Sequence, residues 1–271
     1  MLGARYDGGM KKKQRWVEFT SDELAQVASK NTVAILPLAA VEQHGPHLPL
    51  GVDLFLVDSF IDAALAHAQA QDQLIVLPTM QLGLSTEHEG FSGTISLSAE
   101  MAMAWCHTMA QAVAHAGISK LLLFNSHGGN VGLMDIVGRD IRSKTGLLVF
   151  HSNWYDLAQQ ELMSDLFGQD ELRFGVHAGD AETSLMMAIR PDLVQKSLLA
   201  DHPSAAMSKA KNFPILGDGR SVKQSWMTKD YSPTGAMGNA ARASADKGAR
   251  LLDHVGHRLI ALAREIANFQ P

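Results

Sequence analysis

The chain has 271 residues, of which 46% are hydrophobic, and this is enough apolar material for one large core or two small ones. The formal net charge of −5 at pH 7 and an isoelectric point of about 6.2 argue against binding to nucleic acid or anionic lipid, because both need a basic surface. The single cysteine excludes an internal disulfide bond, and no apolar run reaches the ~18 residues of a membrane span, so we expect a cytoplasmic protein.

The chain opens with a glycine-rich stretch, residues 1–15, that carries three consecutive lysines, Lys11 to Lys13. This composition is typical of a flexible terminal segment, and the stretch lacks the apolar centre of a signal peptide. No internal repeat or break in composition divides the rest of the chain. We therefore predict a flexible leader over residues 1–15 and a single α/β domain over residues 16–271.

Short, continuously apolar runs alternate with longer amphipathic runs along the chain. Strands are expected over residues 32–38, 73–78, 120–125 and 146–151. Helices are expected over residues 21–29, 53–70, 98–116, 130–144, 180–189 and 241–268. Apolar strands joined by helices are typical of a parallel sheet that is covered on both faces, so the expected fold class is α/β. Residues 201–238, which are rich in Pro, Gly, Ser and Lys, are expected to form an ordered excursion or a lid.

Polar side chains follow the expected strands at the points where those strands end. Glu42 and His44 come after the first strand, and Asp53 stands at the start of the next helix. His127, in the segment NSHGGN (125–130), comes after the third strand. Ligands bind at the carboxyl ends of strands in sheets of this kind. Because alternate side chains of an extended segment share a face, Glu42 and His44 can point toward one centre.

A later segment, HAGDAETS (177–184), adds His177, Asp180 and Glu182 to this set. Carboxylates and imidazoles together suit divalent ions such as Zn²⁺, Mn²⁺ or Fe²⁺. A carboxylate that bridges two ions, with one imidazole and one further carboxylate for each ion, would build a binuclear centre. Three separate segments contribute to the set, and this joint placement favours a metal site over a chance grouping.

Each histidine also has a purely structural interpretation. An isolated histidine near a strand end, such as His47, is more often packed or exposed than functional. A structural role is also expected for the histidines inside helical runs, which are His67, His107, His115, His254 and His257. The segment NSHGGN by itself is compatible with a tight turn or with an anion-binding loop that leads into a helix.

The segments EQHGPHLPLGVD, GFSGTISL, NSHGGN and HAGDAETS occur in the order and spacing of the creatininase (creatinine amidohydrolase) family, which this chain resembles from about Trp16 to its final helix. The resemblance implies a three-layer α/β/α fold with a mainly parallel central sheet, and a homohexamer. It also implies a metal-dependent hydrolase that cleaves non-peptide C–N bonds in small amides, cyclic and formyl amides among them.

The resemblance further implies a role for each residue of the metal set. Glu42, Asp53 and His127 would hold one divalent ion. His44, Asp53 and Glu182 would hold the other, so that Asp53 bridges the pair. The ions would be zinc or manganese, with iron as a further candidate. A hydroxide that bridges the two ions would then attack the carbonyl carbon of the substrate.

In the family pattern, His177 takes the position of the proton-transferring histidine, and Asp180 or a backbone carbonyl would orient its ring. The creatinine-hydrolysing members have Tyr-Glu where this chain has Gly128 and Gly129, so we expect a retained metal centre and a changed substrate pocket. The residues expected to contact the substrate are Ser85, His88, Gly128, Trp154 and Phe174.

Several alternatives stay open at the level of sequence. Other family members are formamide hydrolases in flavin-type pathways or peptidases in cofactor maturation. A two-metal phosphoesterase would use the same ligand types, although no cluster of Arg and Lys is evident beside them. An inert metal-binding protein would be favoured by the loss of a ligand, and none is lost. A serine hydrolase is the weakest alternative, because the chain has no G-x-S-x-G motif.

Overall fold

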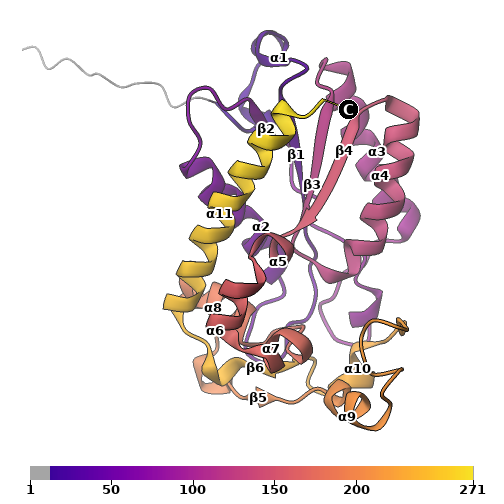
Figure 1. The fold of residues 1–271 in the computed structure, drawn as a ribbon, viewed down its shortest axis with the longest axis vertical. Helices are drawn as coiled ribbons and strands as arrows, with labels where there is room; N and C mark the ends of the chain where they lie inside the picture. Colours follow the sequence, from indigo (N-terminus) through magenta and orange to yellow (C-terminus); the bar gives the residue numbers. More distant parts are fainter. Residues whose placement is uncertain (1–12, 271) are drawn as a thin grey trace, which may run out of the picture.

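The computed structural model describes residues 13–270 (Figure 1). Most of the predicted leader therefore lies outside the described residues. Its last three residues are described, and they lie beside the sheet. The backbone N–H of Val76 donates to the carbonyl of Gln14 at 2.8 Å, and Arg15 forms a parallel bridge with Val76. Gln14 and Arg15 of the predicted leader thus lie against the end of β2.

A four-stranded parallel sheet forms the centre of the molecule, and its carboxyl ends all point the same way. In spatial order the strands are β2 (Leu74–Val76), β1 (Val33–Leu38), β3 (Lys120–Asn125) and β4 (Leu148–Asn153). All four were predicted. The last one ends two residues later than expected, because Asn153 still pairs with Asn125 of β3.

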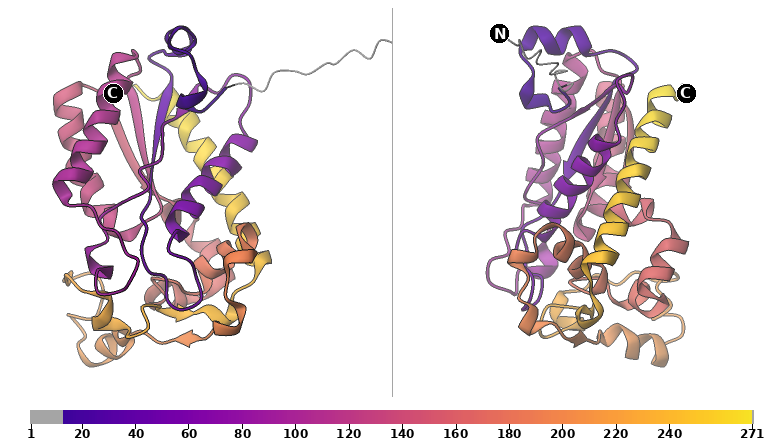
Figure 2. Two further views of the ribbon diagram at one scale, coloured as in Figure 1. Left: turned by 180° about the vertical axis from the view of Figure 1, so that it is seen from behind. Right: turned by 90° about the vertical axis from the view of Figure 1, so that its left-hand side faces the viewer.

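Helices cover both faces of this sheet and produce the three layers that the resemblance implied (Figure 2). The side chains of β1 alternate between two apolar clusters. Val33 and Ile35 belong to the cluster beneath α2 (Val52–Ala66), α8 (Asp180–Ile189) and α11 (Ala245–Asn268). Ala34 and Leu36 belong to the cluster beneath α3 (Ala99–His115) and α4 (Val131–Thr145). This two-sided burial explains why β1 and the middle of β3 are apolar, whereas β4, at the edge of the sheet, ends in polar residues.

Further elements complete the molecule, and most of them gather at the carboxyl ends of the strands (Figure 1). The helices are α1 (Ser21–Val27), α5 (Trp154–Leu157), α6 (Gln160–Phe167), α7 (Gln169–Phe174), α9 (Ala205–Asn212) and α10 (Thr228–Tyr231). The short antiparallel strands are β5 (Asp201–His202) and β6 (Gly238–Asn239). The 3₁₀ turns are Trp16–Glu18, Thr86–His88, Gly128–Asn130, Pro191–Leu193, Lys196–Leu198 and Ala240–Arg242. Only α1 among these was predicted as a helix, but the excursion over residues 201–238 is ordered, as expected.

The helix α11 spans 24 residues along one side of the molecule. It buries Leu251, Val255 and Leu259 against the sheet side and exposes the charged Asp253 and Arg258. This alternation is typical of an amphipathic helix at the surface of a globular protein. Neither this helix nor any other helix within residues 13–270 combines the length and apolar character that crossing a membrane requires.

Candidate metal centre and substrate cavity

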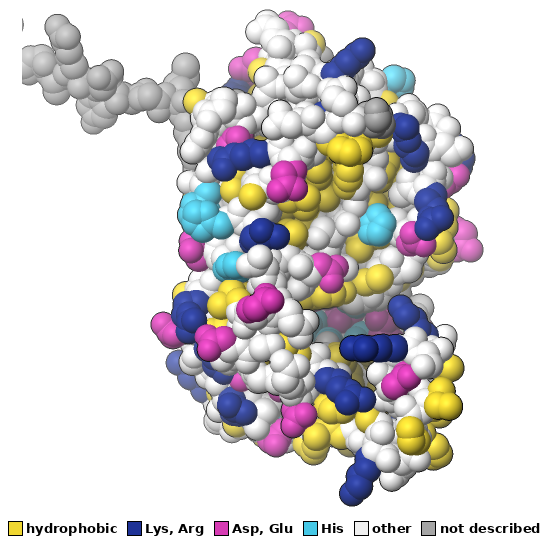
Figure 3. Space-filling view, viewed as in Figure 1, with side chains coloured by type: hydrophobic (Ala, Val, Ile, Leu, Met, Phe, Trp, Pro, Cys, Tyr) yellow, Lys and Arg dark blue, Asp and Glu magenta, His cyan; other side chains and the backbone are white. Residues whose placement is uncertain are grey.

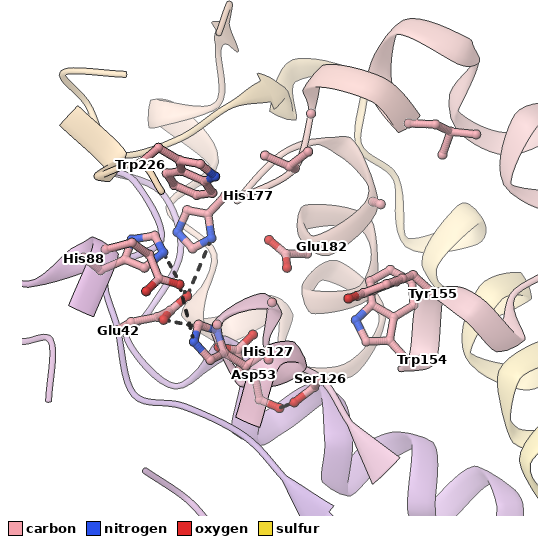
Figure 4. A pocket seen from close by; sticks show the side chains of 18 of the residues that line it. Glu42, Asp53, His88, Ser126, His127, Trp154, Tyr155, His177, Glu182 and Trp226 are labelled. Carbon is pink, nitrogen blue, oxygen red and sulfur yellow. Dashed lines mark hydrogen bonds and ion pairs between the residues drawn. The ribbon is translucent and has the colours of Figure 1, made fainter. Parts of the chain in front are cut away.

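The loops that follow β1 and β3 bring Glu42, Asp53 and His127 together at the carboxyl ends of the strands (Figure 4). The Nδ1 atom of His127 lies 3.2 Å from Oε2 of Glu42 and 3.3 Å from Oδ2 of Asp53. The hydroxyl of Ser126 donates to the backbone carbonyl of Asp53 at 2.8 Å and so joins the start of α2 to the end of β3. All three side chains are buried.

A second group lies on the other side of Asp53. The Nε2 atom of His44 is 3.7 Å from Oδ1 of Asp53 and 4.0 Å from Oε2 of Glu182. Asp53 therefore faces His127 with one carboxylate oxygen and His44 with the other. The structure brings together all five residues that the sequence assigned to the metal centre, with Asp53 between the two groups.

Hydrogen bonds to the backbone set the orientation of both imidazoles. His127 donates from Nε2 to the carbonyl of Leu84 at 2.7 Å, and His44 donates from Nδ1 to the carbonyl of Glu42 at 3.1 Å. These bonds assign the tautomer, because each neutral ring carries one proton. The remaining nitrogen of each ring faces the carboxylates, and it presents a lone pair, as a metal ligand must, once that nitrogen is deprotonated.

Glu182 is held by the turn that precedes α8. Its Oε2 atom accepts a hydrogen bond from the backbone N–H of Ala178 at 2.6 Å. Ala178 has a φ of +52°, a left-handed conformation that costs a non-glycine residue about 1 kcal/mol or more. The N–H of this strained residue donates to the carboxylate of Glu182, whose side chain is 15% exposed. The hydrogen bond from this strained turn thus fixes the direction of Glu182, a candidate metal ligand.

The centre contains more acceptor atoms than donors, and this imbalance is a test of whether a cation fits. Among the described residues, neither Nε2 of His44 nor Oδ2 of Asp53 has a hydrogen-bond partner, although both are buried. Burial, together with the charges of Asp53 and Glu42, raises the pKa of Glu182 to about 7 against the opposing effect of His44. Buried carboxylates that face each other require a positive charge between them, so the residues fit divalent ions.

The buried carboxylates also raise the pKa values of the two imidazoles, His44 and His127. Burial lowers the pKa of His44, but Asp53, with Glu182 and Glu42, raises it to about 9. Burial also lowers the pKa of His127, yet Glu42 and Asp53 raise it well above its usual value. Without metal ions, protons therefore supply the positive charge that the carboxylates need. A divalent ion would displace them, because a ligand must be deprotonated to bind.

His177 lies beside the centre and points toward Glu42. It donates from Nε2 to the carbonyl of Gln43 at 2.7 Å, and its Nδ1 atom lies 3.7 Å from Oε1 of Glu42. Its ring stands between those of His44 and His88, with centroids 4.2 Å away on each side. Burial and the charges of these two histidines hold the pKa of His177 well below its usual value. The side chain is therefore a neutral base at pH 7.

The orienting partner of His177 is thus a backbone carbonyl, and Asp180 has other contacts. Lys247 of α11 donates to Oδ2 of Asp180 at 2.5 Å, and the hydroxyl of Ser184 donates to Oδ1 at 3.0 Å. Of the two alternatives that the sequence allowed, the structure therefore supports the backbone carbonyl. Asp180 connects α8 to α11 instead.

A cavity of about 1210 Å³ opens above the centre and includes three of the five residues expected to contact substrate, which are His88, Gly128 and Trp154. Ser85 is fully buried behind the centre, where its hydroxyl donates to Glu42. Phe174 lies under the guanidinium group of Arg173 and is not among the residues that line the cavity. Trp154 both lines the cavity and stacks on Phe60, with centroids 5.6 Å apart.

Gly129 lies at the edge of this cavity and has no room for a side chain. A Cβ atom there would collide with the carbonyl of Leu84 and with the ring of His127, and it would lie 2.7 Å from Oε1 of Glu87. The carboxylate of Glu87 thus occupies the space beside Gly129, and it also lies 3.7 Å from Nε2 of His127.

Residues that were not predicted complete the cavity wall. They include Glu87, Tyr155, Lys223 and Trp226. Figure 4 shows Trp226 beside His177, whereas Tyr155 lies on the far side of Glu182. In Figure 3 the cavity is a hollow in the lower half of the molecule, with acidic and histidine side chains at its bottom and Lys and Arg side chains near its rim. The only signal for Lys223 and Trp226 in the sequence was the expectation of a lid over residues 201–238.

A family model described as "Creatininase: Creatinine amidohydrolase" matches residues 17–263. The creatinine amidohydrolase of Pseudomonas putida is 28% identical over 252 residues, which cover 88% of this chain and 89% of that protein. The mycofactocin precursor peptide peptidase of Mycobacterium ulcerans is 28% identical over 239 residues, which cover 86% of this chain and 85% of that protein.

Solved structures share this fold. The creatininase structure titled "Creatininase Mn" superposes with a TM-score of 0.76 at 26% identity, covering 96% of this chain and 100% of that one. A mutant creatininase of the Zn–Zn type superposes with a TM-score of 0.74 at 25% identity, covering 96% of this chain and 100% of that one. Both titles name divalent metals of the kinds that the ligand set suits.

Proposed function

We propose a binuclear catalytic centre for this chain, which belongs to the creatininase family. The protein is a metal-dependent hydrolase of amide C–N bonds. In the proposal, Glu42, Asp53 and His127 hold one ion, and His44, Asp53 and Glu182 hold the other. The observation that carries it is the direction of the two oxygens of Asp53, one toward His127 at 3.3 Å and one toward His44 at 3.7 Å.

The ligand types favour zinc or manganese, and the titles of the two solved structures support this choice. Divalent ions bound there would polarise the scissile carbonyl group and lower the pKa of a water molecule to near neutral. The residues of this chain would hold those ions in a buried, polar pocket that is closed beneath by the sheet. They also supply the group that moves protons.

His177 is proposed to move the proton. Its Nε2–H is engaged by the carbonyl of Gln43, so Nδ1 is the atom that is free to accept. A neutral imidazole must take up a proton before it can donate one. His177 would accept a proton from the attacking water as the C–O bond forms, and would return it to the amide nitrogen as the C–N bond breaks. The leaving group then departs as a neutral amine.

The cavity supports a substrate larger than a single small ring. Its volume of about 1210 Å³ exceeds the ~300–1,000 Å³ of most ligand pockets. Trp154, Tyr155 and Trp226 offer aromatic surface on its walls. We favour a small amide that carries a substituent, and a short peptide is the second candidate, supported by this volume and by the similarity to a peptide peptidase.

The cavity gives less support to the phosphoesterase alternative. Lys223 is the one Lys or Arg side chain among the described residues that line it, and phosphoryl transfer usually relies on several cationic groups around the phosphate. Amide hydrolysis needs no such cluster. The charge that develops on the carbonyl oxygen is smaller than the charge of a phosphate group, and it lies next to the proposed metal centre.

One experiment tests the proposed function directly. The protein is stripped of metal, reconstituted with zinc or manganese, and assayed on lactams, formamides, ureides, short peptides and a phosphomonoester. We expect hydrolysis of at least one amide class that is lost on stripping and restored by metal. Hydrolysis of the phosphomonoester alone, or activity that survives complete stripping, would overturn the proposal.

A further inference from the structure

Three side chains outside the catalytic cavity converge on the surface formed by α2 and α11. His67 is the C-cap of α2, and Asp253 and His257 lie on α11. The Nε2 atom of His67 is 3.1 Å from Oδ1 of Asp253, and Nε2 of His257 is 4.0 Å from Oδ2 of the same carboxylate. The two imidazole rings stack with centroids 3.5 Å apart. Since α2 rises ~1.5 Å per residue, His67 lies about 21 Å along the helix from Asp53.

Close packing of the two helices creates this cluster. A Cβ atom at Gly256 would lie 2.7 Å from the Cβ atom of Ala63, so only a glycine allows α11 to approach α2 so closely. Asp253 and His257 are four residues apart and share one face of α11. His67 comes one helical turn after Ala63, and it therefore meets that face where the helices cross.

We propose that His67, Asp253 and His257 form a second binding site, for a divalent transition-metal ion such as zinc. One ligand atom from each residue lies within 4.8 Å of the others. Ligand atoms bound at ~2.0–2.1 Å around a tetrahedral ion are about 3.3 Å apart. Nε2 of His67 and Nε2 of His257 lie 3.1 Å and 4.0 Å from the two oxygens of Asp253, so the side chains must rotate to place one oxygen and both nitrogens around an ion. Two imidazoles and a carboxylate suit zinc, nickel or copper.

A hydrogen bond accounts for only part of this geometry, because Nε2 of His67 lies 3.1 Å from Asp253 whereas Nε2 of His257, at 4.0 Å, is beyond hydrogen-bond distance. The ring planes are 21° apart, so one imidazole must turn out of the stack before both Nε2 lone pairs can reach one ion. The side chains of Asp253 and His257 are 66% and 59% exposed, so an ion from solvent can reach them and keep water in its remaining positions. Histidine side chains are indeed exposed over α11 in Figure 3.

An ion at this site would join α2 to α11 across the surface. The helix α2 carries Asp53, and α11 holds α8 through the contact between Lys247 and Asp180. The packing of α2 on α11 therefore supports both sides of the catalytic centre. An ion that binds only the folded protein stabilises it by mass action. The sequence alone predicted structural roles for His67 and His257, and the proposal extends those roles to metal binding.

The test compares zinc binding to the catalytically loaded enzyme and to its variants by calorimetric titration. We expect the wild-type protein to bind one more zinc ion per chain than His257→Ala or Asp253→Asn. His115→Ala, which removes an exposed histidine at the end of α3, is the matched control and should bind the same number as wild type. Added zinc should raise the melting temperature of wild type and of the control, but not of His257→Ala.

The comparison rests on a difference between variants, so it does not depend on how many ions the catalytic centre holds. All three variants should retain full hydrolytic activity in the loaded state. Equal zinc stoichiometry in wild type and His257→Ala would overturn the proposed surface site and leave the proposed catalytic centre untouched.

Discussion

The backbone N–H of Ala178 donates to the carboxylate of Glu182 at 2.6 Å, so the residue next to the proposed proton carrier also fixes a proposed metal ligand. His177 and Glu182 are therefore held by a single strained turn, although one is proposed to carry a proton and the other to bind a metal ion. This arrangement allows the two roles to be separated by mutation.

Replacing His177 by Ala should preserve the metal content and slow hydrolysis by ~10²–10⁴-fold, the usual contribution of general acid–base catalysis. The loss should shrink for anilides whose leaving nitrogen needs less protonation. Replacing Glu182 by Ala should instead weaken metal binding, because a ligand is lost. Rates across an anilide series, with metal content measured in parallel, decide between these outcomes. The proton-carrying role must be abandoned if His177→Ala loses metal or slows every leaving group equally.

Asp53→Ala should lose both ions rather than one, since its two oxygens face the two groups of ligands. Elemental analysis of the purified protein measures this directly. Asp62→Ala is the matched control, because Asp62 lies on the same helix and its side chain is 70% exposed. It should keep the wild-type metal content. Retention of a full complement in Asp53→Ala would disprove the bridging assignment.

Metal affinity should rise with pH up to about 9, and more steeply below about 7. Glu182, with a pKa of about 7, and His44, with a pKa of about 9, hold protons below those values when no ion is present. Each proton must leave before its ligand binds, so a lower pH favours the competing proton. The apparent affinity should change by up to about tenfold per pH unit for each proton released. Competition with a chelator across this range measures it, and an affinity that is constant or falls with rising pH would contradict the prediction.

Trp226→Ala should raise KM while leaving metal content unchanged. The indole lines the cavity beside His177 but makes no contribution to the ligand set. Loss of ~0.5–1.5 kcal/mol of aromatic contact corresponds to a rise of up to about tenfold. Trp105→Ala, which removes a partly exposed indole on α3, is the control and should have no effect on KM. An unchanged KM in Trp226→Ala would show that the indole of Trp226 does not contribute to substrate binding.

Creatinine should be hydrolysed poorly compared with the true substrate. The family resemblance predicts larger side chains in creatinine-hydrolysing members at the positions of Gly128 and Gly129, so we expect contacts to a small ring to be missing on that side of the cavity. Steady-state kinetics with creatinine measure this. A kcat/KM of ~10⁴ M⁻¹s⁻¹ or more would prove the expectation wrong.

The strands and long helices of the core were predictable, because apolar runs and helix caps involve only residues that are close together in sequence. The strand β3 was predicted with its observed bounds, because Leu121 to Phe124 form an apolar run that is buried on both faces and is flanked by Lys120 and Asn125. Ser98 accepts a hydrogen bond from the backbone N–H of Met101 and begins α3, and Gly117 follows its end with a φ of +82°. Capping is likewise a short-range effect.

The cavity wall was not predictable in the same way, because it depends on which distant segments meet. The helices α5, α6 and α7 have only 4, 8 and 6 residues, so each is too short for a helical pattern to stand out in the sequence. Lys223 and Trp226 reach the cavity only because residues 201–238 fold back over the strand ends. The sequence allowed either Asp180 or a backbone carbonyl to orient His177, and Asp180 instead contacts Lys247, which is 67 residues away in sequence. Assembly into a hexamer stays a prediction from the family.

The tight packing around Gly129 limits how this enzyme can be redesigned. A glutamate cannot be introduced at position 129 by itself, because the carbonyl of Leu84 and the carboxylate of Glu87 already fill the space. Any route toward a pocket with a side chain at 129 must first shorten Glu87 and move the turn that carries Leu84. Leu84 also accepts the hydrogen bond that orients His127, so each such step would disturb a proposed metal ligand. Substrate preference in this protein is therefore coupled to metal affinity, and variants selected for a new substrate should be screened for metal retention at every round.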